Sequence, residues 1–402
     1  MSPPPAVASG DEPTAPRLSL PALFLRFLRF GLLAWGGPVA QIGMLRHELV
    51  DRDRWASPPR FLRALAVYQA LPGPEAHELC CWFGWLSRGR VGSVVAGLGF
   101  MLPGTLLTLL CARLYVAHGL DAPLVAAAFA GMQPAVVALV VRAVPRIGGH
   151  ALRTKAAWVA AGAGVVGEAL GLPFWVPLLF GALWLPNAAH RARAAVLLLA
   201  FLAAVVWLRT GPAAAIAARA APAAATPLLL FAIGLKAGLL TFGGAYTAIP
   251  VVRDETVVAR GWLTDAQFLD AIAVGGVLPA PLVVFGTFVG YVAGGCAGAL
   301  AATAGIFLPA FGFTLVGHRW IERLVEAPRA HVTLDGIAAA VVGLIAATAV
   351  RLAHGALDAP WRALAFAAAL AAALRWRTPW LVPAIVLGGA GVGLVFGPAS
   401  GP

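Results

Sequence analysis

The chain has 402 residues, of which 60% are hydrophobic and only 11% are charged. Soluble domains have about a quarter of their residues charged, so this composition excludes a soluble globular protein and indicates an integral membrane protein. The formal net charge of +12 is carried by arginines in the loops, which points to membrane orientation and anionic lipids before nucleic acid.

Residues 1–17 are rich in proline and lack the basic-then-apolar order of a signal peptide, so we expect a disordered cytoplasmic tail. Apolar segments suited to crossing about 30 Å of hydrocarbon then recur along the chain. They form a first repeat at 18–190, a linker at 191–227 that holds a lone transmembrane helix, and a second repeat at 228–397. The thirteen expected segments are 18–45, 61–87, 91–116, 122–143, 155–171, 173–186, 194–208, 228–250, 266–292, 297–317, 333–350, 361–375 and 379–397.

One sequence pattern occurs in both repeats. The glycine-rich stretch at 31–37 (GLLAWGG) returns at 238–244 (GLLTFGG), and the proline motif at 71–74 (LPGP) returns at 278–281 (LPAP). A duplicated apolar chain with such interruptions is typical of secondary transporters, whose substrate sites lie where the two halves meet. The predicted fold class is an all-α polytopic membrane protein with two homologous repeats and broken helices at these motifs.

The number of segments predicts how the repeats are oriented. If all six segments of repeat one cross, the lone seventh segment makes repeat two start on the opposite side of the membrane from repeat one. The two repeats are then predicted to be inverted relative to each other. The loop arginines favour a cytoplasmic N-terminus, with Arg17 and Arg88 inside and Arg60 outside. The loop at 46–60 is the exception, because it places four arginines outside. A first segment that turns back at its Gly-Gly-Pro sequence would change the assignment of every later segment.

Glycine and proline interrupt four of the apolar segments. Proline removes an amide donor and clashes with the preceding turn, so a helix cannot run through these positions unbroken. Backbone opened at membrane depth must be buried in protein or line a wet cavity, where half-helix N-termini attract an anion. The alternative is a packing kink or a close helix contact, but interruptions at matching positions favour a substrate site. The candidate substrate-binding residues are Gly36, Gly37, Pro72, Gly73, Pro74, Gly243, Gly244, Pro279 and Pro281.

Two basic residues occupy matching positions in the repeats. Arg29 and Lys236 each stand two residues before the shared glycine-rich stretch, in an apolar helix where an ionised side chain is costly. Related by a pseudo-two-fold axis, they are candidates to flank one central, doubly charged anion. The alternative is that each side chain extends to the interface and binds lipid phosphate.

Acidic and imidazole side chains follow the proline motif in repeat one alone. Glu75, His77 and Glu78 are candidates for proton coupling, because such coupling requires groups that gain and lose protons beside a substrate site. The alternative is that Glu75 and Glu78 stabilise the first turn of the following half-helix. Glu168, in another apolar segment, is a weaker candidate.

A charged pair and a tryptophan also recur in both repeats. The members of each pair are two residues apart and do not face each other along a helix, so we expect them to bind other elements as gating or structural residues. They are Arg46, Glu48 and Trp55 in repeat one and Arg253, Glu255 and Trp262 in repeat two.

Motifs of enzyme chemistry are absent from the sequence. It has no GxxxxGK[ST] loop, no HExxH, no C-x-x-C pair and no GxSxG elbow, which argues against an enzyme. We therefore expect no cofactor and no metal site. The alternative from another class is a membrane-embedded enzyme that acts on lipid phosphates through Arg29 and the Glu75–Glu78 cluster.

Taken together, these motifs resemble those of the chromate ion transporter family, and the resemblance covers residues 20–397. It rests on FGLLAWGGP at 30–38, QALPGP at 69–74, LPG at 102–104, TFGGAY at 241–246 and LPAP at 278–281. Ala280 departs from the glycine expected in the last motif.

The resemblance implies an exporter that carries chromate out of the cytoplasm across the inner membrane, driven by the proton-motive force. It also implies two domains of opposite orientation. Sulfate or another anion carried by the same fold is the alternative. The implied partners are chromate, protons and the lipid bilayer, with no nucleic acid, and a homodimer is compatible with the sequence.

Overall fold

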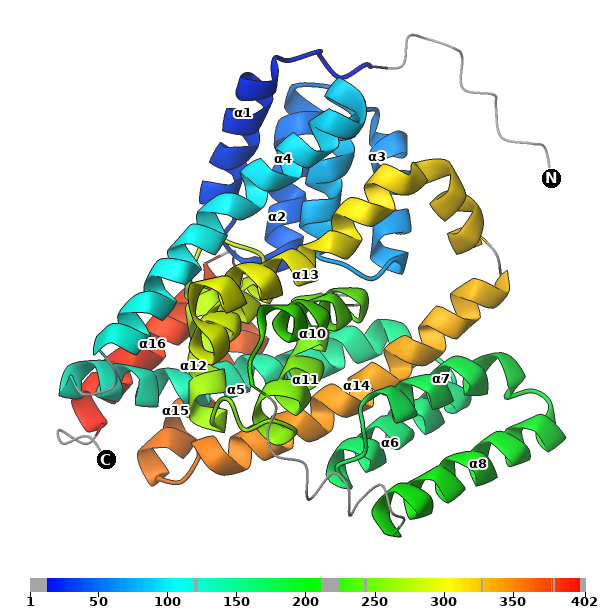
Figure 1. Ribbon diagram of the computed structural model, residues 1–402, viewed down its shortest axis with the longest axis vertical. Coiled ribbons are helices and arrows are strands. Elements are labelled where there is room, and N and C mark those ends of the chain that lie inside the picture. The colour runs from blue at the N-terminus through cyan, green and yellow to red at the C-terminus, as the bar shows by residue number, and fades with distance from the viewer. Residues whose placement is uncertain are drawn as a thin grey trace.

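The computed structural model describes residues 13–118, 122–210, 224–241, 244–326, 328–376, 378 and 380–397, and at residues 70 and 316–330 it describes the backbone alone. Every element in these ranges is a helix (Figure 1), which confirms the all-α prediction. Gly243 and residues 1–12 of the expected N-terminal tail lie outside the described residues.

Repeat one runs from α1 to α7. Its helices begin at favourable residues: the Ser19 side chain accepts a hydrogen bond from the Ala22 amide at the start of α1, and a proline occupies the first turn of α1, α3 and α5. The bounds are α1 Leu20–Leu32, α2 Gly37–Leu45, the π-helix η1 Arg46–Arg52, α3 Pro58–Ala70, α4 Glu75–His118, α5 Pro123–Ala151, α6 Lys155–Ala169 and α7 Trp175–Asn187. The lone helix α8, Arg191–Thr210, follows and buries little of its surface.

Repeat two has the same order of helices. Thr264 forms a capping box with Gln267 at the start of α12, at the position where Ser57 precedes α3. The matching helices α3 and α12 both have 13 residues, and α5 and α14 both have 29. The bounds are α10 Pro227–Leu239, η3 Ala245–Thr247, α11 Ala248–Arg253, the π-helix η4 Asp254–Val258, α12 Asp265–Val277, η5 Leu282–Val284, α13 Phe285–Glu326, α14 Pro328–Ala356, α15 Pro360–Arg375 and α16 Leu381–Phe396.

The long helices α4 and α13 each contain a sharp bend. In α4, Arg88 and Gly89 leave helical geometry, and the φ of Gly89 is 60°, which glycine adopts without strain. A Cβ at Gly84 would collide with the carbonyl of Gly92, whereas residues eight apart in a straight helix are about 12 Å apart. The two halves of α4 therefore fold back on each other. The equivalent bend of α13 is at Gly295, whose φ is 63°.

Among the described residues, five helical stretches are long and apolar enough to cross a membrane by length and composition. They lie at 75–118, 123–151, 191–210, 282–315 and 331–356. The helices α1, α3, α10 and α12 have 13 residues each and rise about 20 Å, short of the roughly 30 Å hydrocarbon core. Each of these four helices is therefore too short to cross the hydrocarbon core by itself.

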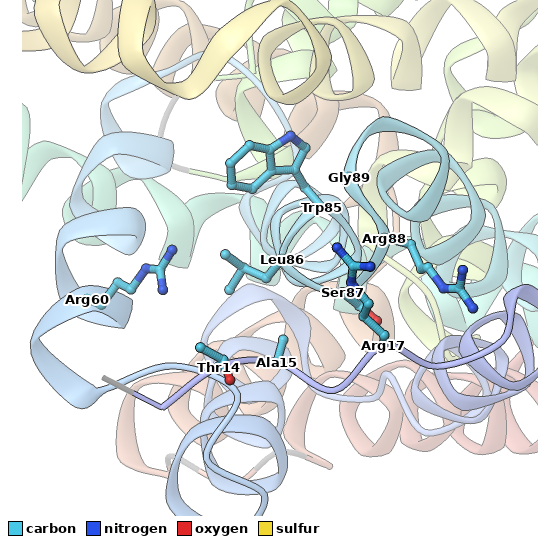
Figure 2. Close-up of a pocket in the computed structure, with 9 residues that line it drawn as sticks. All are labelled: Thr14, Ala15, Arg17, Arg60, Trp85, Leu86, Ser87, Arg88 and Gly89. Carbon is cyan, nitrogen blue, oxygen red and sulfur yellow. The ribbon is translucent and has the colours of Figure 1, made fainter. Parts of the chain in front are cut away.

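In repeat one, the chain turns back after each short helix, so that each pair of helices starts and ends at the same end of the molecule. Arg26 of α1 forms an ion pair with Asp53, which follows η1. Arg17, Arg60 and Arg88 line one hollow of about 470 Å³ (Figure 2), so the chain before α1, the start of α3 and the bend of α4 lie at the same end. The expectation that Arg60 lies on the opposite side from Arg17 and Arg88 is wrong, because α1–α2 and α3–α4 form hairpins.

The last two helices of each repeat pack against a long helix of the other repeat. α5 packs against α15 and α16, and α14 packs against α6 and α7. Glycines permit both crossings, since a Cβ at Gly131 of α5 would collide with the Gly389 carbonyl of α16, and a Cβ at Gly336 of α14 would collide with the Gly181 carbonyl of α7. In Figure 1, α5 and α14 run through the lower half of the molecule, with α6 and α7 beside α14. The last helices are thus exchanged between the repeats.

Candidate functional site

The four connections that contain the Gly-Gly and Pro-x-Pro motifs meet where the repeats touch. The amide of Gly73, between α3 and α4, donates a hydrogen bond to the carbonyl of Thr241, just after α10 (2.8 Å). Gln41 of α2 donates from Nε2 to the carbonyls of Ala34 (2.9 Å) and Ala280 (3.1 Å). Each Gly-Gly connection therefore lies against the proline connection of the other repeat.

A small cavity lies at this junction. Its volume is about 30 Å³, which is close to the share of liquid volume that one water molecule takes. Three helices begin at its wall, α2 at Gly37, η3 at Ala245 and η5 at Leu282, so N–H groups of their first turns lie there without helical partners. The lining residues are Gly36, Gly37, Pro38, Ala245, Tyr246, Gly275, Gly276, Leu278, Ala280, Leu282 and Val382.

Several residues predicted at the interruptions shape this junction. Gly36 and Gly37 have φ of 87° and 77°, and Gly244 has φ of 124°, conformations that other residues rarely adopt. The methyl group of Ala280 is buried against Gly104 of α4. The glycine missing from the second proline motif is thus compensated by a glycine on the facing helix. The prolines of the two proline connections are Pro72, Pro74, Pro279 and Pro281.

Glu75, His77 and Glu78 lie in the first turn of α4, directly after the proline connection, and all three are buried. The side chain of Glu78 lies against Gly73, and neither of its oxygens has a hydrogen-bond partner among the described residues. Gln69 hydrogen-bonds to Glu75. A buried carboxylate without a donor is charged only at a high cost in free energy, so Glu78 has the surroundings of a group that carries a proton.

His77 links this turn to repeat two. Its ring centroid lies 4.9 Å from that of Phe307 and 4.8 Å from that of Phe311, both in α13. Its Nδ1 lies 3.8 Å from the sulfur of Cys81, one turn further along α4. The imidazole is therefore held in place between the repeats by aromatic packing.

The two matched cations are not among the residues that line the central cavity. Arg29 is exposed and lines a groove with Glu48 and Arg52. Lys236 is half exposed, and its Nζ lies 2.7 Å from Oε1 of Glu255. In this conformation Lys236 is therefore engaged by a carboxylate, while Arg29 faces a groove at the surface.

An ion-pair network joins the two repeats beside α11. Arg253 is 5% exposed and contacts Asp265 at 2.7 Å and Glu168 at 3.5 Å. Glu168 belongs to α6 of repeat one and also lies 3.6 Å from Arg351 of α14. A buried guanidinium needs such partners, so Glu168 ties α6 to two helices of repeat two.

Within the described part of the chain, the matching positions of repeat one form ion pairs only inside η1. Arg46, the counterpart of Arg253, lies 3.8 Å from Asp51, and both side chains are exposed. Glu48 pairs with Arg52 one turn away in η1 at 2.6 Å. The two sets of matching residues therefore differ, because the ion pairs of Arg253 join the repeats and those of Arg46 and Glu48 stay within η1.

The two matched tryptophans each have an arginine over the ring. The guanidinium of Arg26 lies 4.9 Å from the centroid of Trp55, and that of Arg260 lies 5.3 Å from the centroid of Trp262. Cation–π contacts of this kind orient both partners. Each tryptophan thus anchors the loop that leads from the π-helix to the next helix.

Gln41 and Asp270 are candidates that the sequence analysis missed. Neither has a like counterpart in the other repeat, because Ala248 stands at the position that matches Gln41 and Arg63 at the position that matches Asp270. A comparison of the two repeats therefore does not single out either residue. Asp270 is nevertheless the one charged residue in segment 266–292, and an acid alone in an apolar segment is a functional signal in itself.

Comparison with known proteins identifies the family. A family model described as "Chromate transporter" matches residues 21–225 and 228–394, which fits the two repeats. A chromate transport protein of Pseudomonas aeruginosa is 50% identical over 98% of this chain and 97% of its own length. A chromate transport protein of Cupriavidus metallidurans is 32% identical over the same shares of the two chains, 98% and 97%. No solved structure matches significantly. These relatives are transporters rather than enzymes, and with its apolar helices the chain is a multi-pass membrane protein that belongs to the chromate transporter family.

Proposed function

We propose that the protein is a secondary active transporter that exports chromate from the cytoplasm across the inner membrane, coupled to the proton-motive force. The observation that carries the proposal is the junction of the four connections, a small cavity where helices of both repeats begin. Helix N-termini bind tetrahedral oxyanions through their N–H groups, and secondary transporters bind substrates between such repeats. The names of the two relatives suggest which anion is carried.

In this proposal the hairpins of repeat one enter the membrane from the cytoplasmic side and those of repeat two from the opposite side, so that their tips meet midway. The loop charges support this arrangement, because most basic residues then fall on the side of the N-terminus. That side holds Arg17, Arg46, Arg52, Arg54, Arg60, Arg88, Arg90, Arg146, Arg153, Lys155, Arg191 and Arg193. The other side holds Arg113, Arg209, Arg253, Arg260, Arg351 and Arg362.

Chromate reaches the junction by alternating access. A cavity of about 30 Å³ has room for one water, so the repeats must separate at one side to admit an oxyanion. We assign the network around Glu168 and Arg253 as the gate of the outer side, and the weaker pairs of Arg46 and Glu48 as its inner counterpart. Opening of the outer gate separates Glu168 from Arg253.

Two further groups of residues have roles in this scheme. Arg29 and Lys236 lie one turn before the Gly-Gly connections and approach the anion as the repeats move, after Lys236 leaves Glu255. Glu78, with Glu75 and His77 beside it, binds and releases the coupled proton. Outward movement of a dianion gains about 2.3 kcal/mol per charge for each 100 mV of inside-negative potential, so the proton acts chiefly in gating.

Uptake of labelled chromate into everted membrane vesicles tests the proposal. The wild-type protein is expected to show saturable chromate uptake that an imposed proton gradient stimulates, with sulfate acting as a competitor. Gln41→Ala is expected to abolish uptake while the protein still inserts, because it removes the hydrogen bond to Ala280 that joins the tips and the hydrogen bond to Ala34 within the tip of repeat one, each contributing about 0.5–1.5 kcal/mol.

Asn187→Ala is the matched control, because it removes two side-chain hydrogen bonds at the exposed end of α7, one donated to the carbonyl of Leu183 and one accepted from Arg193. It is expected to leave uptake unchanged. Vesicles that accumulate sulfate but not chromate would contradict the assigned substrate. Wild-type uptake by Gln41→Ala would show that the junction is not the transport site.

A further inference from the structure

Asp270 is a fully buried carboxyl group at the contact between the two repeats. It lies in α12, about two turns before that helix ends at Val277. Its Oδ2 accepts a hydrogen bond from the hydroxyl of Tyr115 (2.9 Å), and its Oδ1 accepts one from Nε2 of Gln133 (3.0 Å). Tyr115 belongs to α4 and Gln133 to α5, so a hairpin of repeat two is fastened to two long helices of repeat one.

The partners of Asp270 are neutral. Tyr115 is the titratable group that faces it from α4, and Gln133 faces it from α5. Phe288 of α13 and Phe129 of α5 pack on the Tyr115 ring, with centroids 5.0 and 5.4 Å away. No ion pair joins Asp270 to a lysine, arginine or histidine in the described part of the chain. Carboxyl groups placed in this way inside membrane proteins mark proton or substrate pathways.

The hydrogen-bond chemistry of this group permits two protonation states. When Asp270 is ionised, the tyrosine hydroxyl and the glutamine amide both donate to it. When Asp270 is protonated, its own O–H donates to the Tyr115 oxygen, because a hydroxyl also accepts, and Gln133 continues to donate to the carbonyl oxygen. Both states keep two hydrogen bonds. Adding a proton therefore keeps both side-chain contacts of Asp270, and its cost is that the Tyr115 O–H gives up Asp270 as its acceptor.

We propose that Asp270 is a proton-binding site that couples proton transfer to the position of the α12–α13 hairpin, an inference that rests on the proton-coupled transport proposed above. While α12 lies against α4 and α5, two donors stabilise the ionised carboxylate. When the hairpin moves away, the carboxylate loses both donors and takes up a proton. Its return to Tyr115 and Gln133 favours release of that proton.

This site differs from Glu78 in position and in chemistry. Glu78 lies beside the proline connection of repeat one and receives no hydrogen bond from the described residues, whereas Asp270 lies in repeat two and receives two. The connection that α12 enters contains Ala280, which Gln41 binds at the junction of the tips. A change in the position of α12 is therefore transmitted directly to the wall of the cavity.

Purified protein in liposomes tests the coupling. Asp270→Asn has the shape and the hydrogen-bonding capacity of the protonated acid and cannot release a proton. It is expected to retain chromate–chromate exchange at the wild-type rate and to lose the stimulation of chromate uptake by a proton gradient. Asp358→Asn, at an exposed acidic residue after α14, is the matched control and is expected to retain both. Gradient-stimulated uptake by Asp270→Asn with an unchanged pH profile would overturn the proposal.

Tyr115→Phe provides a second variant that removes a single hydroxyl. The ionised carboxylate then loses one of its two donors, so the pH midpoint of gradient-driven uptake is expected to move to higher pH. The control Asp358→Asn is expected to leave the pH midpoint at the wild-type value. A midpoint that does not move in Tyr115→Phe contradicts the assigned role of the hydroxyl and counts against the site.

Infrared difference spectra between low and high pH test proton binding without reference to transport. A carboxylic-acid band that is present in the wild type and in Glu78→Gln but absent in Asp270→Asn supports the site. Because Glu78 is itself proposed to bind a proton, the deciding comparison is made in Glu78→Gln, where survival of this same band after Asp270→Asn is added overturns the site. If wild-type uptake itself shows no stimulation by a proton gradient, the proton coupling in the proposed function fails, and the spectra still decide whether Asp270 binds a proton.

Discussion

Two buried carboxyl groups of this protein differ in the number of hydrogen bonds that they accept. Asp270 accepts two hydrogen bonds, whereas Glu78 accepts none from the described residues. The local sequence accounts for the difference, because the turn before Glu78 is Pro-Gly-Pro. Its prolines have no N–H to donate, and the amide of Gly73 is already bound to Thr241. The same motif that interrupts the helix thus leaves the adjacent carboxyl group without donors.

Glu78→Gln is expected to fold and insert normally, because the neutral amide removes a group whose ionised form costs several kcal/mol to bury. Chromate uptake by the variant is expected to depend less steeply on pH, since one of the two proposed proton-binding groups, the one beside the proline connection of repeat one, is gone. Uptake measured over a pH series checks this, with Asp358→Asn at the exposed acidic residue after α14 as the control. A pH profile like that of the wild type would remove Glu78 from the coupling scheme.

Helices of this protein approach each other most closely at glycines. Where α5 crosses α16, the backbone of Gly131 lies directly against the carbonyl of Gly389, and α14 and α7 repeat the arrangement with Gly336 and Gly181. Association of helices in a membrane depends on such close packing, because lipid tails are as apolar as the side chains themselves. The exchange of final helices between the repeats therefore relies on residues without side chains.

Gly131→Ala is expected to lower the free energy of unfolding by about 1–3 kcal/mol, because the new methyl group meets backbone that can move only if α5 and α16 separate. Gly149→Ala in the same helix meets no atom within 4 Å. It is expected to be neutral or stabilising by up to about 1 kcal/mol, as alanine is the better helix former. Thermal unfolding in detergent compares the two variants, and equal midpoints would argue against a tight crossing at Gly131.

At the scale of the whole molecule, the membrane topology depends on where hairpins turn back. The ion pair of Arg26 with Asp53, and the hollow shared by Arg17, Arg60 and Arg88, place the starts and ends of the first two hairpins together, away from the tips that meet repeat two. This arrangement also accounts for the arginine-rich loop at 46–60. The loop lies with the other basic segments, as the positive-inside rule favours.

Labelling with a membrane-impermeant maleimide tests this topology. The exposed native Cys296 is first replaced by serine. Cysteines introduced at Arg17 and Arg60 are expected to react from the cytoplasmic side, and a cysteine at Val258 is expected to react from the opposite side. Reaction of the cysteines at positions 17 and 60 from different sides would contradict the hairpins. Reaction of all three from one side would contradict opposite orientation of the repeats.

Much of the fold could be predicted because the signals for it are local. Each expected apolar segment overlaps a helix, since hydrophobic length and the positions of glycine and proline act within a few residues. The duplication was visible as a repeated pattern. The sequence left open whether the first segment crosses or turns back, because α1 and α2 together are as apolar as a full span. Composition alone does not distinguish a span from a hairpin that turns back at Gly36.

The candidate site also has a part that the sequence predicts and a part that it does not. Its glycines and prolines, and the buried Glu78, could be named from the chain, because interrupted backbone and an acid in an apolar segment each carry a cost that points to function. The contacts that these elements make could not be predicted from the sequence. Gln41 and Ala280 are 239 positions apart, and Asp270 meets Tyr115 155 positions away. Contacts of that kind depend on how two hairpins and two long helices pack, which is a property of the assembled molecule and has no local pattern in the chain.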